Sequence, residues 1–232
     1  MPRTARITIV DVPHHITQRG NNRQDVFFVD DDRRVYLSIL KEQSEKYGLE
    51  ILGWCLMTNH IHLIARPSAP ESLAKALGRT HLRYAQYVNR LHGRSGHLWQ
   101  NRFFSCPLGR KQFWQVLRYT EQNPVRAGVI KTAWKYPWSS AKAHLTGEDE
   151  MGLLDMSHWR QISGQVDWRQ ALEKVQAKEL IEQIRLNTHT GRPLAGDSFI
   201  SKVEKLLHRR LRPLPIGRPK KTKRMSESEN NR

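Results

Sequence analysis

The sequence predicts an α+β fold: a ferredoxin-like split βαβ domain with a helical C-terminal extension and a basic tail. Short apolar runs of strand length and longer runs with helical spacing follow each other as strand, helix, strand, strand, helix, strand and helix. The first six of these elements have the order of the split βαβ unit. We therefore expect an antiparallel sheet with helices on one face.

Turn and capping signals define the first strand and the first helix. Residues 14–29 read as two short extended pieces around a turn at residues 19–22, which contains Gly and two Asn. The acidic residues at 30–32 favour the positive N-terminal end of a helix dipole, so we expect a helix to begin there. Apolar residues recur with helical spacing up to Tyr47, and Gly48 can end the helix.

The remaining elements of the domain follow from the same reasoning. They are, in order, a hairpin of strands at 49–56 and 60–65, a helix between Pro70 and Gly93, a mostly extended segment at 96–108 and a helix at 111–123. Pro124 lacks the N–H group that the next helical hydrogen bond needs, so we expect it to stop the last of these helices.

The charge is unevenly placed and divides the chain into three parts. Residues 1–146 hold 22 Lys/Arg and 10 Asp/Glu, residues 147–208 hold 8 and 10, and residues 209–232 hold 9 and 2. We expect one domain in the first part and a helical extension in the second, with helices at 167–186 and around 199–207. The third part is expected to be a basic, disordered tail that binds DNA.

Composition limits the class of partner and the compartment. The formal net charge is +17 and the isoelectric point about 10.3, which predicts a partner that carries phosphates. An anionic membrane surface is the weaker alternative. The sequence has no run of 18 apolar residues to span a bilayer and no apolar signal peptide. Two cysteines are too few for a disulfide scaffold, so a cytoplasmic location fits best.

Two histidines in the second strand of the expected hairpin form half of a candidate metal site. His60 and His62 are two residues apart, so in a strand both side chains point to the same face, while Ile61 points to the other. Imidazole is the commonest metal-ligating side chain. A lone His-x-His is more often an ordinary strand feature, so the pattern needs a second group nearby.

A tyrosine on the last helix of the domain supplies that second group. Tyr119 and Asn123 are four residues apart, so they are neighbours on one helix face. At 100° per residue, they lie roughly 80–120° from the apolar stripe formed by Phe113, Leu117 and Thr120. Tyr119 is therefore not the obvious core aromatic of its own helix, whereas Tyr36, Tyr47, Tyr84 and Tyr87 fit apolar stripes and look structural.

Together these motifs resemble those of the single-tyrosine HUH transposases, and most closely those of the REP-associated tyrosine transposases. The resemblance is carried by Met57-Thr58-Asn59-His60-Ile61-His62 and by a helical tyrosine followed by Gln122-Asn123-Pro124-Val125-Arg126-Ala127-Gly128. The opening Thr17-Gln18-Arg19-Gly20-Asn21 and the tail Ile216-Gly217-Arg218-Pro219-Lys220-Lys221 are similar to the same group. The likeness covers roughly residues 10–146 and, more loosely, the tail.

The resemblance implies a bacterial DNA strand transferase. By it, Tyr119 is the nucleophile and forms a covalent 5′-phosphotyrosine, while His60 and His62 bind Mg²⁺ or Mn²⁺. Many relatives place a glutamine four residues after the tyrosine as a third ligand, and this sequence has Asn123 there. The implied substrate is single-stranded DNA at repetitive palindromic elements that form hairpins. The implied protein is a monomer or homodimer, cytoplasmic and associated with the nucleoid.

Basic residues around the motifs are candidates for DNA contact. They are Arg19, Arg23, Arg83, Arg102 and Arg126 in the domain and Arg218, Lys220 and Lys221 in the tail. Basic grooves with stacking aromatic side chains suit single strands and hairpins. The tail segment Gly217-Arg218-Pro219-Lys220 resembles the core of an AT-hook, which is a minor-groove element.

Two other functions remain open. A catalytically silent DNA-binding protein could mark palindromic repeats, although the presence of Tyr119 with both histidines argues against it. A metal-dependent hydrolase could use His60 and His62, but the sequence offers no third strong ligand at a suitable spacing.

Overall fold

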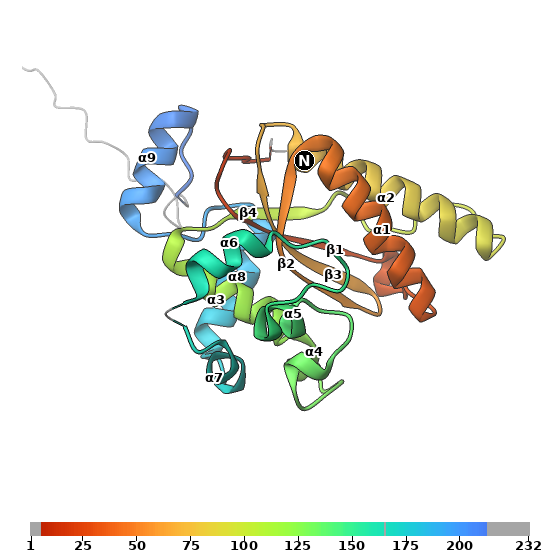
Figure 1. Ribbon diagram of the computed structural model, residues 1–232. Coiled ribbons are helices and arrows are strands. Elements are labelled where there is room, and N and C mark those ends of the chain that lie inside the picture. The colour runs from red at the N-terminus through yellow and green to blue at the C-terminus, as the bar shows by residue number, and fades with distance from the viewer. Residues whose placement is uncertain (1–5, 165, 213–232) are drawn as a thin grey trace, which may run out of the picture.

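A four-stranded antiparallel sheet forms the centre of the computed structural model, which describes residues 6–164 and 166–212 (Figure 1). Its strands are β1 (His14–Arg19), β2 (Leu49–Met57), β3 (His60–Pro67) and β4 (Phe104–Pro107). The strand order is β2-β3-β1-β4, and each neighbouring pair is antiparallel. This is the order of the split βαβ unit, so the predicted fold class is confirmed.

The two long helices cover one face of the sheet. Helix α1 (Asp30–Tyr47) begins where the Asp32 carboxylate accepts the backbone N–H groups of Phe28 and Val29, at 2.7 and 3.0 Å. It ends at Gly48, whose φ of 61° favours glycine. Helix α2 (Ser72–Leu91) packs beside α1, and both bury their apolar stripes against the sheet.

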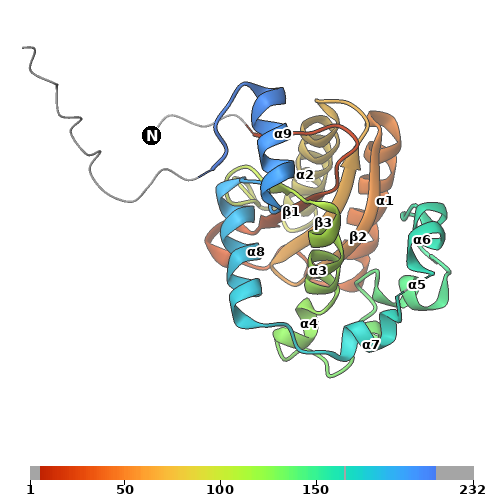
Figure 2. The same ribbon diagram turned by 90° about the vertical axis from the view of Figure 1, so that its left-hand side faces the viewer.

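Further helices cover the second face, where the prediction had placed none. Helices α3 (Arg110–Glu121) and α8 (Lys178–Thr190) lie on the side of the sheet opposite α1 and α2 (Figures 1 and 2). Nearly every residue of β2 and β3 is buried, so an open second face would expose large apolar side chains to water. Helix α3 approaches β2 closely at Gly53, where a Cβ atom would lie 2.4 Å from Leu117 Cδ1.

Shorter helices connect and follow these elements. They are η1 (Asn21–Arg23), α4 (Asn123–Arg126), η2 (Ala133–Lys135), α5 (Ala141–Thr146), α6 (Met156–Ser163), α7 (Trp168–Glu173) and α9 (Asp197–Leu207). None of the described helices is long and apolar enough to cross a membrane.

Three sequence expectations about these short elements were wrong. Residues 21–23 form a 3-10 turn where a turn was expected, but residues 24–29, expected as a second extended piece, form no strand. Pro124 lies within the first turn of α4, a position that needs no N–H donor, so the chain stays helical beyond α3. The helix expected at 167–186 is two helices, α7 and α8, and Val175 between them is 95% exposed rather than part of an apolar stripe.

The part after residue 146 packs onto the sheet. Trp159, Trp168, Leu172 and Ile184 lie in the same core cluster as Leu117 of α3. A separate small cluster joins the N-terminal residues Ile7 and Ile9 to Val203 of α9 and to Leu211, which falls within the expected tail. Segments distant in the sequence therefore meet in both clusters.

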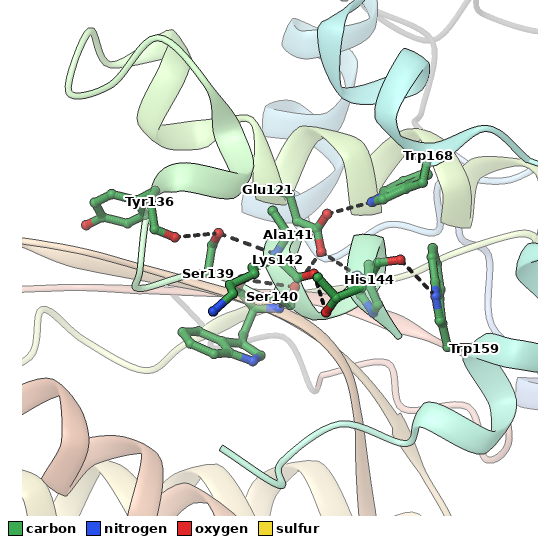
Figure 3. A network of polar contacts seen from close by, with 11 residues as sticks. Glu121, Tyr136, Ser139, Ser140, Ala141, Lys142, His144, Trp159 and Trp168 are labelled. Atoms are coloured by element: carbon green, nitrogen blue, oxygen red, sulfur yellow. Dashed lines mark hydrogen bonds and ion pairs between the residues drawn. The ribbon is translucent and has the colours of Figure 1, made fainter. Parts of the chain in front are cut away.

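A buried polar network fixes the C-terminal end of α3 (Figure 3). Glu121 Oε1 accepts a hydrogen bond from Ser140 Oγ and one from His144 Nδ1, both at 2.5 Å. Its other carboxylate oxygen accepts from Trp168 Nε1 at 2.8 Å. Because Glu121 is fully buried, these three donors supply the polar contacts that its carboxylate needs. The network ties α3 to α5 and α7.

A Glu121→Gln substitution is expected to lower the free energy of unfolding by about 3 kcal/mol. The amide keeps the size of the side chain, but its NH₂ group faces donors and leaves at least one of them without an acceptor. Urea denaturation at neutral pH measures the change. Glu42→Gln is the control, because Glu42 pairs with Arg83 on the surface and such pairs contribute little. Equal stability of the two variants would contradict the structural role of the network.

Candidate active site

The four candidate catalytic and metal-binding residues line one cavity. His60, His62, Tyr119 and Asn123 surround a space of about 810 Å³ between the sheet and helices α3 and α8. Their exposed fractions are 5% for His62, 4% for Tyr119 and 9% for Asn123, and His60 is half-buried. The fold thus brings together two motifs that are more than fifty residues apart in the chain.

Strand register places both histidines on the cavity side. His62 pairs with Thr17 and His60 pairs with Arg19 on β1, and side chains opposite each other in a sheet share a face. The intervening Ile61 points the other way, into the core beneath α1 and α2. The alternation inferred from the sequence therefore holds in β3.

Tyr119 packs against the rings of the histidines. Its ring centroid lies 5.6 Å from that of His62 and 5.7 Å from that of His15. The rings of His60 and His62 are 5.2 Å apart. Tyr119 is buried, as a core aromatic would be, but much of its packing is with these polar rings.

Burial keeps both candidate ligands neutral. Loss of hydration and, to a smaller extent, the charge of Arg19 together lower the pKa of His60 from 6.5 to about 4. The pKa of His62 is also well below its ordinary value, because the ring is buried and lies near His60, His15 and Arg126. Neutral imidazole is the form that binds a metal ion, so at neutral pH both rings are ready to do so.

The hydrogen bonds of the two rings fit a metal site. His60 Nδ1 lies 2.6 Å from Asn59 Oδ1, and His62 Nδ1 lies 3.0 Å from His15 Nε2. Each ring uses Nδ1 for this contact and keeps Nε2 for a ligand, as ligating histidines commonly do. Among the described residues no group of three His, Cys, Asp or Glu side chains could hold a metal ion. The amide of Asn123, which lines the same cavity, is the third ligand that the sequence suggested, and the amides of Gln18, Gln100 and Asn101 line the cavity as well.

Arg126 lies against the candidate nucleophile. Its guanidinium carbon is 4.0 Å from the centre of the Tyr119 ring, and its Nη2 donates to the Tyr119 backbone oxygen at 2.7 Å. Burial lowers the pKa of Arg126, but a guanidinium remains charged at neutral pH. The sequence had suggested Arg126 only as a DNA contact, whereas the structure places its charge beside Tyr119.

The other candidate DNA contacts are spread over several places. Arg19 and Arg23 line the cavity. Arg102 lines an adjoining cavity of about 390 Å³ that Arg6 and Arg209 also line. Arg83 lies on α2, on the opposite side of the sheet, and pairs with Glu42. Arg218, Lys220 and Lys221 lie outside the described residues.

Sequence reasoning missed several residues of the cavity. They are His15, Gln100, Asn101, Arg185, Thr188 and His189. His15 had a usable signal, since it alternates with Thr17 and Arg19 along β1 and so shares their face. Helix α8 gave no local signal, because its place beside the cavity depends on tertiary packing alone.

Comparison with known proteins identifies the family of this fold and site. The family model described as "Transposase IS200 like" matches residues 8–123, which is half of the chain. The chain belongs to the IS200-like transposase family. All the residues of the cavity up to Asn123 fall within the matched region, whereas α8 lies beyond it.

Two known proteins are similar to this chain. A protein of Haemophilus influenzae, provisionally named a REP-associated tyrosine transposase, is 26% identical over an alignment 136 residues long, and the match covers 52% of this chain and 77% of the relative. A solved structure of a REP-associated tyrosine transposase bound to a REP hairpin covers 67% of this chain and 90% of its own, at 18% identity and a TM-score of 0.55. At that identity the solved structure supports the fold of this IS200-like transposase.

Proposed function

We propose that this protein cleaves and rejoins single-stranded DNA at palindromic repeats that form hairpins, through a covalent 5′-phosphotyrosine. The position of Tyr119 carries the proposal, because its ring packs against His62 in a cavity that His60 and Asn123 also line. A nucleophile and two neutral imidazoles in one basic cavity suit transesterification of a phosphodiester. Membership of the transposase family and similarity to REP-associated relatives support hairpin DNA as the substrate.

In the proposed reaction, the phenol oxygen of Tyr119 attacks the scissile phosphorus. A bond forms between that oxygen and phosphorus, the bond from phosphorus to the 3′ oxygen breaks, and the phenol proton is released as the free 3′-OH takes one up. Attack of a 3′-OH on the phosphotyrosine reverses the step and rejoins the strand. The Arg126 charge, 4.0 Å from the ring, stabilises negative charge on the reacting groups.

We propose further that His60, His62 and the amide oxygen of Asn123 hold Mg²⁺ or Mn²⁺. When bound, such an ion acts as a Lewis acid on the oxygens of the scissile phosphate. The two neutral rings with available Nε2 atoms support this assignment. Arg19 and Arg23, which line the same cavity, are placed to bind the phosphates on either side of the cleaved bond.

An adduct assay tests this function. Labelled hairpin DNA with a single-stranded extension is incubated with the protein and Mg²⁺ or Mn²⁺, and the mixture is then denatured. A protein–DNA adduct that survives denaturation is the expected result. Binding without cleavage would instead favour a silent DNA-binding protein, and free cleaved ends without an adduct would favour a hydrolase.

His60→Ala and His62→Ala are each expected to reduce adduct formation more than about 100-fold, because loss of a ligand costs more than loss of a supporting contact. DNA affinity, measured by gel shift, should change little, since it comes mainly from Lys and Arg contacts with phosphates. His97→Ala is the matched control, because His97 is exposed and does not line the cavity. Normal cleavage by either site variant would show that the metal assignment is wrong.

A further inference from the structure

A chain of three hydrogen bonds connects His62 to helix α8. His62 Nδ1 lies 3.0 Å from His15 Nε2, and His15 Nδ1 lies 2.7 Å from Thr188 Oγ1. The Thr188 hydroxyl in turn donates to the backbone oxygen of Ile184 at 2.7 Å. His15, His62 and Thr188 are 1%, 5% and 3% exposed. The chain is therefore shielded from water and crosses from β3 through β1 to the C-terminal extension.

The direction of each proton in this chain follows from its last acceptor. The carbonyl oxygen of Ile184 can only accept, so the hydroxyl proton of Thr188 points to it. The Thr188 oxygen must then accept from His15, which places the His15 proton on Nδ1. A buried imidazole with no carboxylate partner is neutral and carries one proton, so His15 Nε2 is an acceptor.

The same reasoning fixes the tautomer of His62. Because His15 Nε2 accepts, the proton between the two rings belongs to His62 Nδ1. His62 Nε2 then carries a free lone pair, which is the atom that a metal ion needs. With the proton on Nε2 instead, His62 could not bind an ion in the cavity.

We infer that His15 and Thr188 set the tautomer of His62, so that helix α8 of the C-terminal extension is a working part of the active site. The inference rests on the proposed function, in which His62 is a metal ligand. His15 and Thr188 are positioning residues, since they act through His62. His15 and Thr188, which contact each other in this chain of hydrogen bonds, are 173 residues apart in the sequence, so the site depends on correct docking of α8.

The tautomer of His60 is set separately, by hydrogen bonds of the neighbouring residue Asn59. His60 Nδ1 lies 2.6 Å from Asn59 Oδ1, while the Asn59 amide nitrogen donates to the Arg23 backbone oxygen. That second bond orients the amide so that its oxygen faces His60. Loss of the α8 chain should therefore affect His62 and leave His60 unchanged, which gives an internal reference.

The first experiment reads the tautomer in metal-free protein. Two-bond ¹⁵N–¹H correlation spectra of protein labelled at histidine show which ring nitrogen of His62 carries the proton, and a His62→Gln variant assigns the signals. The expected wild-type result is a proton on Nδ1, and the expected result for Thr188→Val is a His62 ring with a substantial Nε2–H population. A wild-type His62 with its proton on Nε2 would overturn the inference.

The second experiment measures Mn²⁺ affinity by titration calorimetry. His15→Phe and Thr188→Val are expected to weaken binding by about 10- to 100-fold, as loss of an outer hydrogen-bond partner usually does. His15→Gln and Thr188→Ser should restore it, because each replaces the missing hydrogen-bonding group. Thr190→Val is the matched control, since Thr190 makes the same hydroxyl-to-carbonyl bond on α8 outside the chain. Wild-type affinity in both His15→Phe and Thr188→Val would contradict the inference.

The two experiments separate this inference from the proposed function. If wild-type protein binds no Mn²⁺ but shows a His62 tautomer that changes in Thr188→Val, the chain stands and the metal assignment fails. If Mn²⁺ binds but both His15→Phe and Thr188→Val keep the wild-type tautomer, the metal assignment stands and the chain fails. Thermal unfolding of each variant identifies any general loss of structure. Where His15→Phe or Thr188→Val proves unstable, the inference is tested on His15→Gln and Thr188→Ser instead.

Discussion

A Tyr119→Phe variant is expected to form no covalent adduct and to reduce strand cleavage at least about 1,000-fold, since its nucleophile is missing. The substitution removes one oxygen and keeps the ring, so the packing against His62 and the guanidinium of Arg126 should survive. DNA binding should therefore change little. Gel shift measures affinity, and denaturing gels of labelled DNA measure adduct and cleaved ends.

Tyr87→Phe is the matched control for this experiment. Tyr87 is half-buried on α2, and its hydroxyl donates to Asp32 at 3.2 Å on the far side of the sheet from the cavity. We expect this variant to form adduct at the wild-type rate. Adduct formation by Tyr119→Phe together with its loss in Tyr87→Phe would show that Tyr87, on the other side of the sheet, is the nucleophile.

Much of the site could be predicted because local periodicity determines it. The two-residue repeat of a strand places His60 and His62 on one face. The helical repeat was a weaker guide for Tyr119, which is buried in the same cluster as Phe113 although its angular position lies outside the stripe of Phe113. The strand order also followed from the sequence of elements, since the split βαβ unit has a fixed topology. These inferences depend only on residues within one element or within two consecutive elements.

The rest of the site depends on contacts between distant segments. Thr188 reaches His15 only because α8 docks on β1 and β4, and the sequence of α8 gives an apolar stripe without naming its partner. The burial of both faces of β2 and β3 was visible as continuous apolar runs, but the run alone did not identify the covering helices. The division at residue 146 followed a change in charge, which carries no information about packing.

Acid is expected to unfold this protein between about pH 6 and pH 4. Four histidines have a lowered pKa because they are buried: His14 and His60 at about 4, and His15 and His81 at about 3. Each is neutral in the folded state, while in the unfolded chain its pKa is near 6.5. Stability from these groups is thus complete above pH 6.5 and falls as the pH decreases toward the folded pKa, because only the unfolded chain takes up protons.

The expected loss is comparable to the whole stability of a domain. Each histidine costs up to about 1.4 kcal/mol per pH unit in this window, so each removes roughly 2.5 kcal/mol by pH 4.5. Four together remove several kcal/mol, against a typical total of about 5–15 kcal/mol. Urea denaturation followed by circular dichroism at pH 7, 6 and 5 measures the slope of the unfolding free energy with pH.

His81 provides the sharpest test, because it lies outside the catalytic cavity. Its ring is buried against Trp99 and Phe103, and its Nε2 lies 3.2 Å from the Tyr36 hydroxyl. His81→Phe should keep the aromatic packing and reduce the slope below pH 6 by about 1 kcal/mol per pH unit. The same substitution at exposed His97 should leave the slope unchanged. Loss of the Tyr36 contact changes the unfolding free energy by the same amount at every pH, so it does not affect the slope of that free energy with pH. An equal slope in the His81→Phe and His97→Phe variants would show that His81 does not titrate on unfolding as proposed.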